Sequence, residues 1–315
     1  MNASSKFAGF TVGLAAVFAL ALGAGAAFGP EVPAPADTHD TSTHDAGPGS
    51  ITDAPVAEQT PGGLMVTDSG YTLALDTAQV PAGANVPLRF RILDADGQPV
   101  TRYVDSHDKQ LHLIAVRRDL TGYQHVHPVL DAAGTWSVPL DLTRAGAYRV
   151  FADFTPDGGD GVTLGADLQV AGAYDPQTLP PVAAATVVDG YTVTLDGTLT
   201  PGQASKVTLS VARGGQPVTD LQPYLGAYGH LVALRAADLG YLHVHPDGHP
   251  GDGVTAPGPG IDFYVTTPSA GDYRLFLDFQ HDGVVRTAEF TLTAGQSSGA
   301  AAPPAPEPMP AGHGH

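Results

Sequence analysis

The sequence predicts an all-β protein built from two tandem β-sandwich domains, and three observations support this. Apolar or alternating runs of five to eight residues, rich in Val, Leu, Tyr and Phe, recur along the chain. Turn-forming residues are abundant, with 39 Gly and 28 Pro in 315 residues. The central region of the chain also occurs twice, which indicates an internal duplication.

The expected strands of the first copy are short and closely spaced. They are YTLALDT, VPLRFRIL, LHLIAVR, TWSVPLDL and YRVFADF, separated by Asp-Gly, Ala-Gly-Ala and Gly-Gly groups. About seven short strands in about 100 residues are typical of an immunoglobulin-like β-sandwich. A jelly roll is the alternative. The chain has no Cys, so it lacks the Cys…Trp…Cys pattern of antibody domains.

The duplication defines the domain boundaries. Gly-Tyr-Thr at 70–72 returns at 190–192, GQPVT at 97–101 returns at 215–219, and AGAYRVFADF at 145–154 returns as AGDYRLFLDF at 270–279. These matches predict one sandwich at 63–172 and a second at 183–295. The linker between them, 173–182, contains Pro180-Pro181 and is expected to be short and stiff.

The flanking segments differ in composition from the two repeats. Residues 1–29 carry an uncharged apolar run from Phe7 to Phe28, which predicts an N-terminal helix that is either a cleaved signal peptide or a retained membrane anchor. Residues 30–62 and the His-containing tail 296–315 are polar and rich in Pro, which predicts disorder. Whether this helix is cleaved or retained, the rest of the chain is expected to be extracytoplasmic. Contact with the membrane is expected through the N-terminal helix alone.

Charge and sulfur content restrict the ligands. With 32 acidic residues against 14 Lys and Arg, the net charge of −18 disfavours nucleic acid and favours cations. The absence of Cys and the presence of only three Met exclude thiolate sites and disfavour a methionine-rich copper(I) site. Any metal ion is therefore expected to have nitrogen and oxygen ligands.

Two equally spaced histidine trios are the candidate binding residues. In GHLVALRAADLGYLHVHP, His230 is followed by His243 and His245, and in LHLIAVRRDLTGYQHVHP, His112 is followed by His125 and His127 at the same intervals. Alternate residues of a strand share a face, so each His-x-His pair should point one way, with the first His coming across from a paired strand. We expect each trio to meet at one end of its sandwich, and His281 to be a fourth ligand in the second.

Three imidazoles are a known ligand set for zinc and also suit copper(II). No HExxH or P-loop motif occurs, and His125-x-His127…Asp131 matches a cupin motif only faintly, so no enzymatic activity is predicted. The candidate cofactor is thus a divalent metal ion, copper or zinc.

The strings GHLVAL…YLHVHP and LHLIAV…QHVHP, each followed by GxYRxFxDF, resemble bacterial extracytoplasmic proteins similar to the YtkA-like β-sandwich domain. This resemblance covers residues 63–295. It implies a secreted or membrane-associated sandwich and makes copper the leading metal. The resulting prediction is a metal buffer, sensor or carrier. The alternative is a structural or protein-interaction module that contacts another cell-envelope protein.

Overall fold

The computed structural model describes residues 60–295, apart from the side chains of His243 and His245. The predicted N-terminal helix, most of the predicted linker 30–62 and the tail 296–315 lie outside the described residues. Within residues 60–295, no helix is long and apolar enough to cross a membrane. The described chain is all-β and forms two tandem immunoglobulin-like sandwiches, which confirms the predicted fold class.

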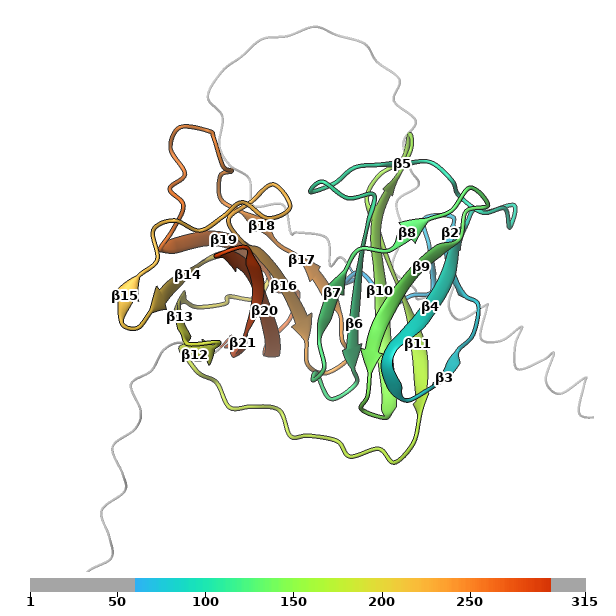
Figure 1. The fold of residues 1–315 in the computed structure, drawn as a ribbon, viewed down its shortest axis with the longest axis horizontal. Coiled ribbons are helices and arrows are strands. Elements are labelled where there is room, and N and C mark those ends of the chain that lie inside the picture. Colours follow the sequence, from blue (N-terminus) through green and yellow to red (C-terminus); the bar gives the residue numbers. More distant parts are fainter. Residues whose placement is uncertain (1–59, 296–315) are drawn as a thin grey trace, which may run out of the picture. The chain divides into compact units, whose positions relative to one another are not determined.

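The first sandwich consists of two sheets that share one core (Figure 1). One has the strand order β1-β2-β4-β9-β8: β1 Thr67–Asp68, β2 Tyr71–Leu75, β4 Gly83–Leu93, β9 Trp136–Leu142 and β8 Val129–Leu130. The other has the order β3-β11-β10-β6-β7, with β5 Tyr103–Val104 paired to β10: β3 Gln79–Pro81, β11 Val162–Ala171, β10 Gly146–Pro156, β6 Leu111–Arg117 and β7 Gln124–Val126. The five predicted strands correspond to β2, β4, β6, β9 and β10.

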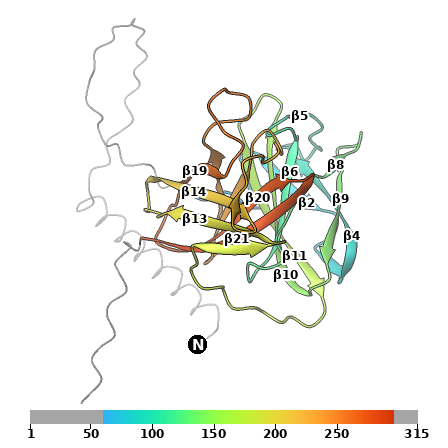
Figure 2. The same cartoon turned by 60° about the vertical axis from the view of Figure 1, so that its left-hand side comes forward.

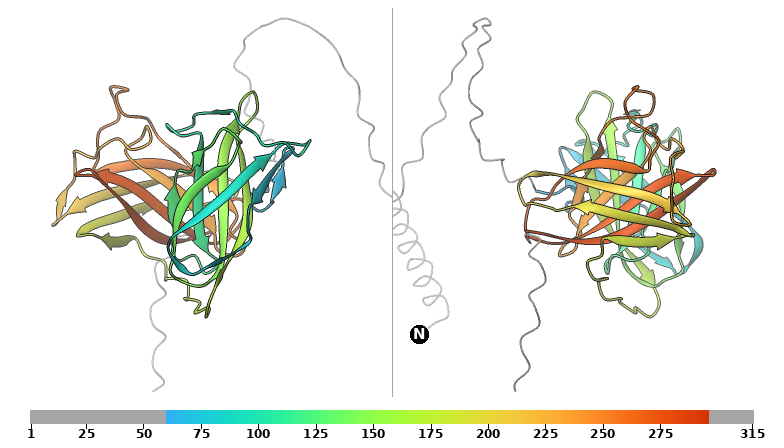
Figure 3. Two further views of the ribbon diagram at one scale, coloured as in Figure 1. Left: turned by 45° about the vertical axis from the view of Figure 1, so that its right-hand side comes forward. Right: turned by 90° about the vertical axis from the view of Figure 1, so that its left-hand side faces the viewer.

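The second sandwich repeats this arrangement, and its strands are seen from other sides in Figures 2 and 3. One sheet has the order β12-β13-β14-β19-β18, with β15 Gln216–Pro217 paired to β14: β12 Ala185–Val188, β13 Tyr191–Gly197, β14 Ala204–Arg213, β19 Gly260–Thr266 and β18 His245–Pro246. The other has the order β17-β16-β20-β21: β17 Tyr241–His243, β16 His230–Arg235, β20 Gly271–His281 and β21 Val284–Ala294.

Strands β6 and β16 are buried on both faces. Leu113 and Ala115 of β6 point into the core of the first sandwich. Their neighbours Ile114 and Val116 belong to a separate apolar cluster that also contains residues of the second sandwich. A strand that is covered on both sides has a nearly continuous apolar sequence, and LHLIAVR and HLVALR both fit this description.

The cluster between the sandwiches is built from the same positions of the two repeats. Ile114 and Val232, Val116 and Leu234, and Phe151 and Phe276 are equivalent pairs, and all six are buried in it. The aromatic contacts are reciprocal. Tyr123 stacks on Phe276 with ring centroids 4.0 Å apart, and Tyr241 packs on Phe151 at 5.6 Å. The two sandwiches therefore contact each other through a two-fold-like interface, as in a symmetric dimer.

The N-terminal end of the described chain also enters this contact. The backbone N–H of Tyr241 donates to the carbonyl of Gly62 at 3.0 Å. The carbonyl of Gly63 accepts from Nε and Nη2 of Arg149 at 3.1 and 2.7 Å. Gly62 was predicted to lie in the disordered linker 30–62 because of its Pro-rich surroundings. Its bridge to Tyr241 instead makes it part of the folded region.

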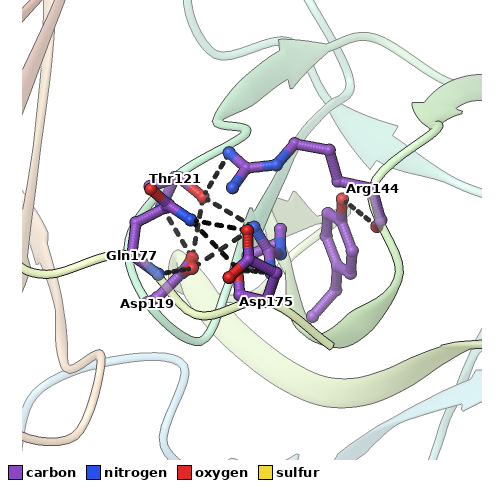
Figure 4. A network of polar contacts seen from close by, with 7 residues as sticks. Asp119, Thr121, Arg144, Asp175 and Gln177 are labelled. Carbon is purple, nitrogen blue, oxygen red and sulfur yellow. Dashed lines mark hydrogen bonds and ion pairs between the residues drawn. The ribbon is translucent and has the colours of Figure 1, made fainter. Parts of the chain in front are cut away.

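The linker between the sandwiches is tied to the first of them by a polar network (Figure 4). The carboxylate of Asp119 accepts from the backbone N–H of Gln177 at 2.9 Å and lies 3.3 Å from the guanidinium of Arg117. Arg117 in turn donates to the carbonyl of Asp175 at 3.0 Å. Because Arg117 and Asp119 are both buried, these contacts restrain the linker more than its two prolines alone would.

Candidate metal centre

The structure brings His112, His125 and His127 together. One ring nitrogen from each lies within 4.8 Å of the others. His112 is on β6, His125 is on the neighbouring strand β7, and His127 directly follows β7. The predicted meeting of the first trio across two antiparallel strands is therefore present. The trio lies on the outer face of the sheet, which also carries Ile114 and Val116, and Asp278 of the second sandwich contacts it there.

Outer hydrogen bonds determine which nitrogen carries the proton in two of the three rings, His112 and His125. His112 Nε2 lies 2.9 Å from the carbonyl oxygen of Ser106, and His125 Nδ1 lies 2.8 Å from a carboxylate oxygen of Asp278. Both partners are acceptors, so both of these nitrogens are N–H donors. The lone pairs are therefore on His112 Nδ1 and His125 Nε2.

These two lone-pair nitrogens face each other at 3.0 Å. His127 Nε2 is 3.3 Å from the same His112 Nδ1. A proton on His127 Nε2 could be donated to His112 Nδ1. The lone pair on His125 Nε2 would then still face the lone pair on His112 Nδ1. Neutral rings in this arrangement therefore call for a cation between them.

The spacing suits a transition-metal ion. Metal–nitrogen distances of about 2.0–2.1 Å in tetrahedral geometry place two ligand nitrogens about 3.3–3.4 Å apart. The observed separations of 3.0 and 3.3 Å are close to this value. The carbonyl of Ser106 and the carboxylate of Asp278 then occupy the outer positions that orient metal-bound imidazoles in many proteins.

Burial keeps the rings of His112 and His127 neutral. Burial, together with the neighbouring histidines, lowers the pKa of His112 to about 4 and that of His127 to about 3. Burial likewise lowers the pKa of His230 to about 4. Neutral imidazole is the form that binds metal, so His112 and His127 can still bind an ion well below neutral pH.

Acid is therefore expected to destabilise the metal-free protein. The unfolded chain, with histidine pKa values of 6.5, binds more protons than the folded chain between pH 6.5 and 4, so the stability present above pH 6.5 is lost as the pH falls through this window. We predict a falling melting temperature in chelator-treated protein from pH 7 to pH 4.5, with a shallower fall in H112A/H127A.

A melting temperature that falls only below about pH 4 would contradict this prediction, because protonation of carboxylates would then cause the fall. The lowered pKa values of several aspartates place their contributions below pH 3.8: Asp119, Asp131, Asp238, Asp252 and Asp262.

The second trio is only partly described. His230 on β16 donates from Nε2 to the carbonyls of Tyr224 and Leu225 at 3.1 and 3.0 Å, which leaves its lone pair on Nδ1, as in His112. β16 and β17 pair as predicted. His243 ends β17 and His245 begins β18, which belongs to the other sheet. The expected single strand for this pair was wrong, because the chain changes sheets at the buried Val244.

His281 lies in different surroundings. Its Nδ1 is 2.7 Å from the hydroxyl of Tyr191, and its Nε2 is 3.1 Å from the carboxylate of Asp220. Both ring nitrogens are thus engaged, and among the described residues none of its contacts is with His230. The end of β20 points this ring to Tyr191 on β13.

Two residues near the trio were not predicted as part of a site. His107 has ring centroids 6.1 Å from His112 and 5.0 Å from His230. It has no counterpart in the second repeat, where Leu225 occupies this place, so the duplication did not reveal it. Asp278 corresponds to Asp153 of the first repeat, and neither was among the candidate ligands.

Fold and histidine group together define a tandem β-sandwich protein with a possible three-imidazole metal centre. Residues 65–172 and 185–296 each match a family described as a domain of unknown function, DUF8832. These two matches cover more than half of the chain, so the protein belongs to the DUF8832 family, with two copies of its domain.

Solved structures match the chain only at low similarity. The Yersinia pseudotuberculosis adhesin InvE is 12% identical with a TM-score of 0.21, and the match covers 74% of this chain and 60% of InvE. Invasin, a bacterial integrin-binding protein, is 16% identical with a TM-score of 0.20, and the match covers 71% of this chain and 39% of invasin. Domains 4–9 of the surface-layer protein SbsC are 12% identical with a TM-score of 0.22, and the match covers 71% of this chain and 31% of that structure.

The chain spans less than two thirds of each of these three proteins. Identities and TM-scores this low carry no information about activity or partners. A search of curated proteins found no match.

Proposed function

We propose that this protein binds a divalent metal ion outside the cytoplasm through His112, His125 and His127, without catalysing a reaction. The observation that carries the proposal is the pair of lone-pair nitrogens facing each other at 3.0 Å, with their tautomers set by Ser106 and Asp278. Such a pair is repulsive when empty and favourable around a cation.

Copper(II) is the preferred ion and zinc the next. An all-nitrogen site binds copper(II) more tightly than zinc by the usual order of divalent affinities. The resemblance to the YtkA-like domain, which makes copper the leading metal, points the same way. The negative net charge of the chain would gather cations near it. A buffer, sensor or carrier needs only such reversible binding, and His230, His243 and His245 are proposed as a second set of ligands.

The test is a metal titration of the full-length protein. After removal of metal with a chelator, the wild type, the H112A/H125A/H127A variant and a variant with Ala at the terminal histidines His39, His44, His313 and His315 are titrated with Cu²⁺ and Zn²⁺. We expect tight binding by the wild type and the terminal variant, and the loss of one tight site in the triple variant.

Equal binding by the wild type and the triple variant would contradict the proposal. It would leave a structural role for the two sandwiches as the better account.

A further inference from the structure

The carboxylate that orients His125 comes from the other sandwich. Asp278 lies on β20, opposite His230 in the strand register, and is 3% exposed. Its Oδ2 accepts from His125 Nδ1 at 2.8 Å, and its Oδ1 accepts from the hydroxyl of Thr287 at 2.6 Å. Thr287 on β21 thus fixes the carboxylate, and the carboxylate fixes a ligand of the first sandwich.

A small cavity beside the trio is also shared. It has a volume of about 30 Å³, which is enough to hold a water molecule. Its polar lining comes from both sandwiches: His107, His112, His125 and Asp153 from the first, and His230 from the second. The ring of His230 lies 6.4 Å from that of His112 and 6.3 Å from that of His125, measured between centroids.

The surrounding contact holds these groups in place. The reciprocal apolar cluster that contains Phe151 and Phe276 flanks the histidines on β6 and β16. Any change that separates the sandwiches removes Asp278 from His125. The first trio then keeps its three rings but loses the acceptor that holds the lone pair of His125 toward the other two.

We infer that the metal site is completed only when the two sandwiches are in contact, with Asp278 as the positioning residue, so that a bound ion also strengthens that contact. This inference rests on the proposed function. The two effects are necessarily reciprocal: if contact between the sandwiches raises metal affinity, the metal stabilises the contact by the same factor. The duplication would then complete the centre of His112, His125 and His127 at the interface of the two copies.

The test uses the full-length protein with Asp278→Asn. Thr287 donates to Oδ1, so the amide group of the variant would keep its oxygen toward Thr287 and turn its NH₂ toward His125. The ring must then accept at Nδ1, and its proton moves to Nε2, the ligand atom. Loss of an outer partner lowers metal affinity by about 10- to 100-fold, and we expect a loss in this range. Nitrogen NMR of the His125 ring should show the changed tautomer, which a merely structural defect would not produce.

Asp220→Asn is the matched control. It makes the same exchange beside another ring, since Asp220 pairs with His281 at 3.1 Å and is 81% exposed. We expect its metal affinity to equal that of the wild type, and Asp278→Glu to recover part of the affinity that Asp278→Asn loses.

The outcomes separate the two proposals. If the wild type binds no ion, the proposed function fails. If the wild type binds and Asp278→Asn binds equally well, only the shared-site inference is overturned. If Asp278→Asn does not fold, Thr287→Val decides: a smaller loss of affinity in a folded protein supports the inference, and unchanged affinity overturns it.

Discussion

Replacing Phe276 with Ala is expected to lower the free energy of unfolding by about 3–5 kcal/mol, the usual cost of removing a buried Phe ring. Phe276 is 0% exposed and lies in the apolar cluster between the sandwiches, stacked on Tyr123 at a centroid distance of 4.0 Å. The substitution leaves a cavity and removes an aromatic pair that contributes about 0.5–1.5 kcal/mol more. Urea-induced unfolding of the full-length protein measures the loss.

The matched control is Val187→Ala on β12, where the side chain is 71% exposed. Surface substitutions of this kind change stability by about 0.5 kcal/mol or less. If Phe276→Ala cost no more than Val187→Ala, the cluster would not be holding the sandwiches together. A large loss would show that the outer faces of β6 and β16 form a true core.

The strand pattern and the duplication were sufficient to predict the two sandwiches. Alternation in TWSVPLDL matches the half-buried strand β9, and the continuous apolar run LHLIAVR matches the doubly buried β6. What covers the second face of β6 could not be predicted, because the covering residues belong to β16 and β20, more than 100 positions later in the chain.

The candidate site could also be predicted only in part from the sequence. The repeated spacing identified His112, His125 and His127 correctly as neighbours, because local strand pairing between β6 and β7 brings them together. Asp278 could not be assigned to them, since its contact with His125 spans 153 positions and depends on the packing of the two sandwiches. The expectation for His243 and His245 assumed one continuous strand, whereas the backbone changes sheets between them.

The second prediction of large effect concerns the imidazole protons. In the metal-free protein, His112 should carry its proton on Nε2 and His125 on Nδ1, because the carbonyl of Ser106 and the carboxylate of Asp278 accept from these atoms. Adding one equivalent of Zn²⁺ should therefore change the signals of His112 Nδ1 and His125 Nε2 most. The signal of His127 Nε2, at 3.3 Å from His112 Nδ1, should change with them.

His249 and His281 serve as internal references. His249 is exposed in a loop, and both nitrogens of His281 are engaged by Tyr191 and Asp220. Their signals should remain unchanged at one equivalent of Zn²⁺. A change at all histidines in parallel would indicate weak, unspecific binding.

Nitrogen NMR of the histidine rings during a Zn²⁺ titration of the full-length protein is thus the most direct test of the metal centre. The predicted result is the Nε2–H tautomer for His112, the Nδ1–H tautomer for His125, and zinc-dependent changes at the facing nitrogens of His112, His125 and His127. Opposite tautomers, or a trio whose signals do not respond to the ion, would contradict it.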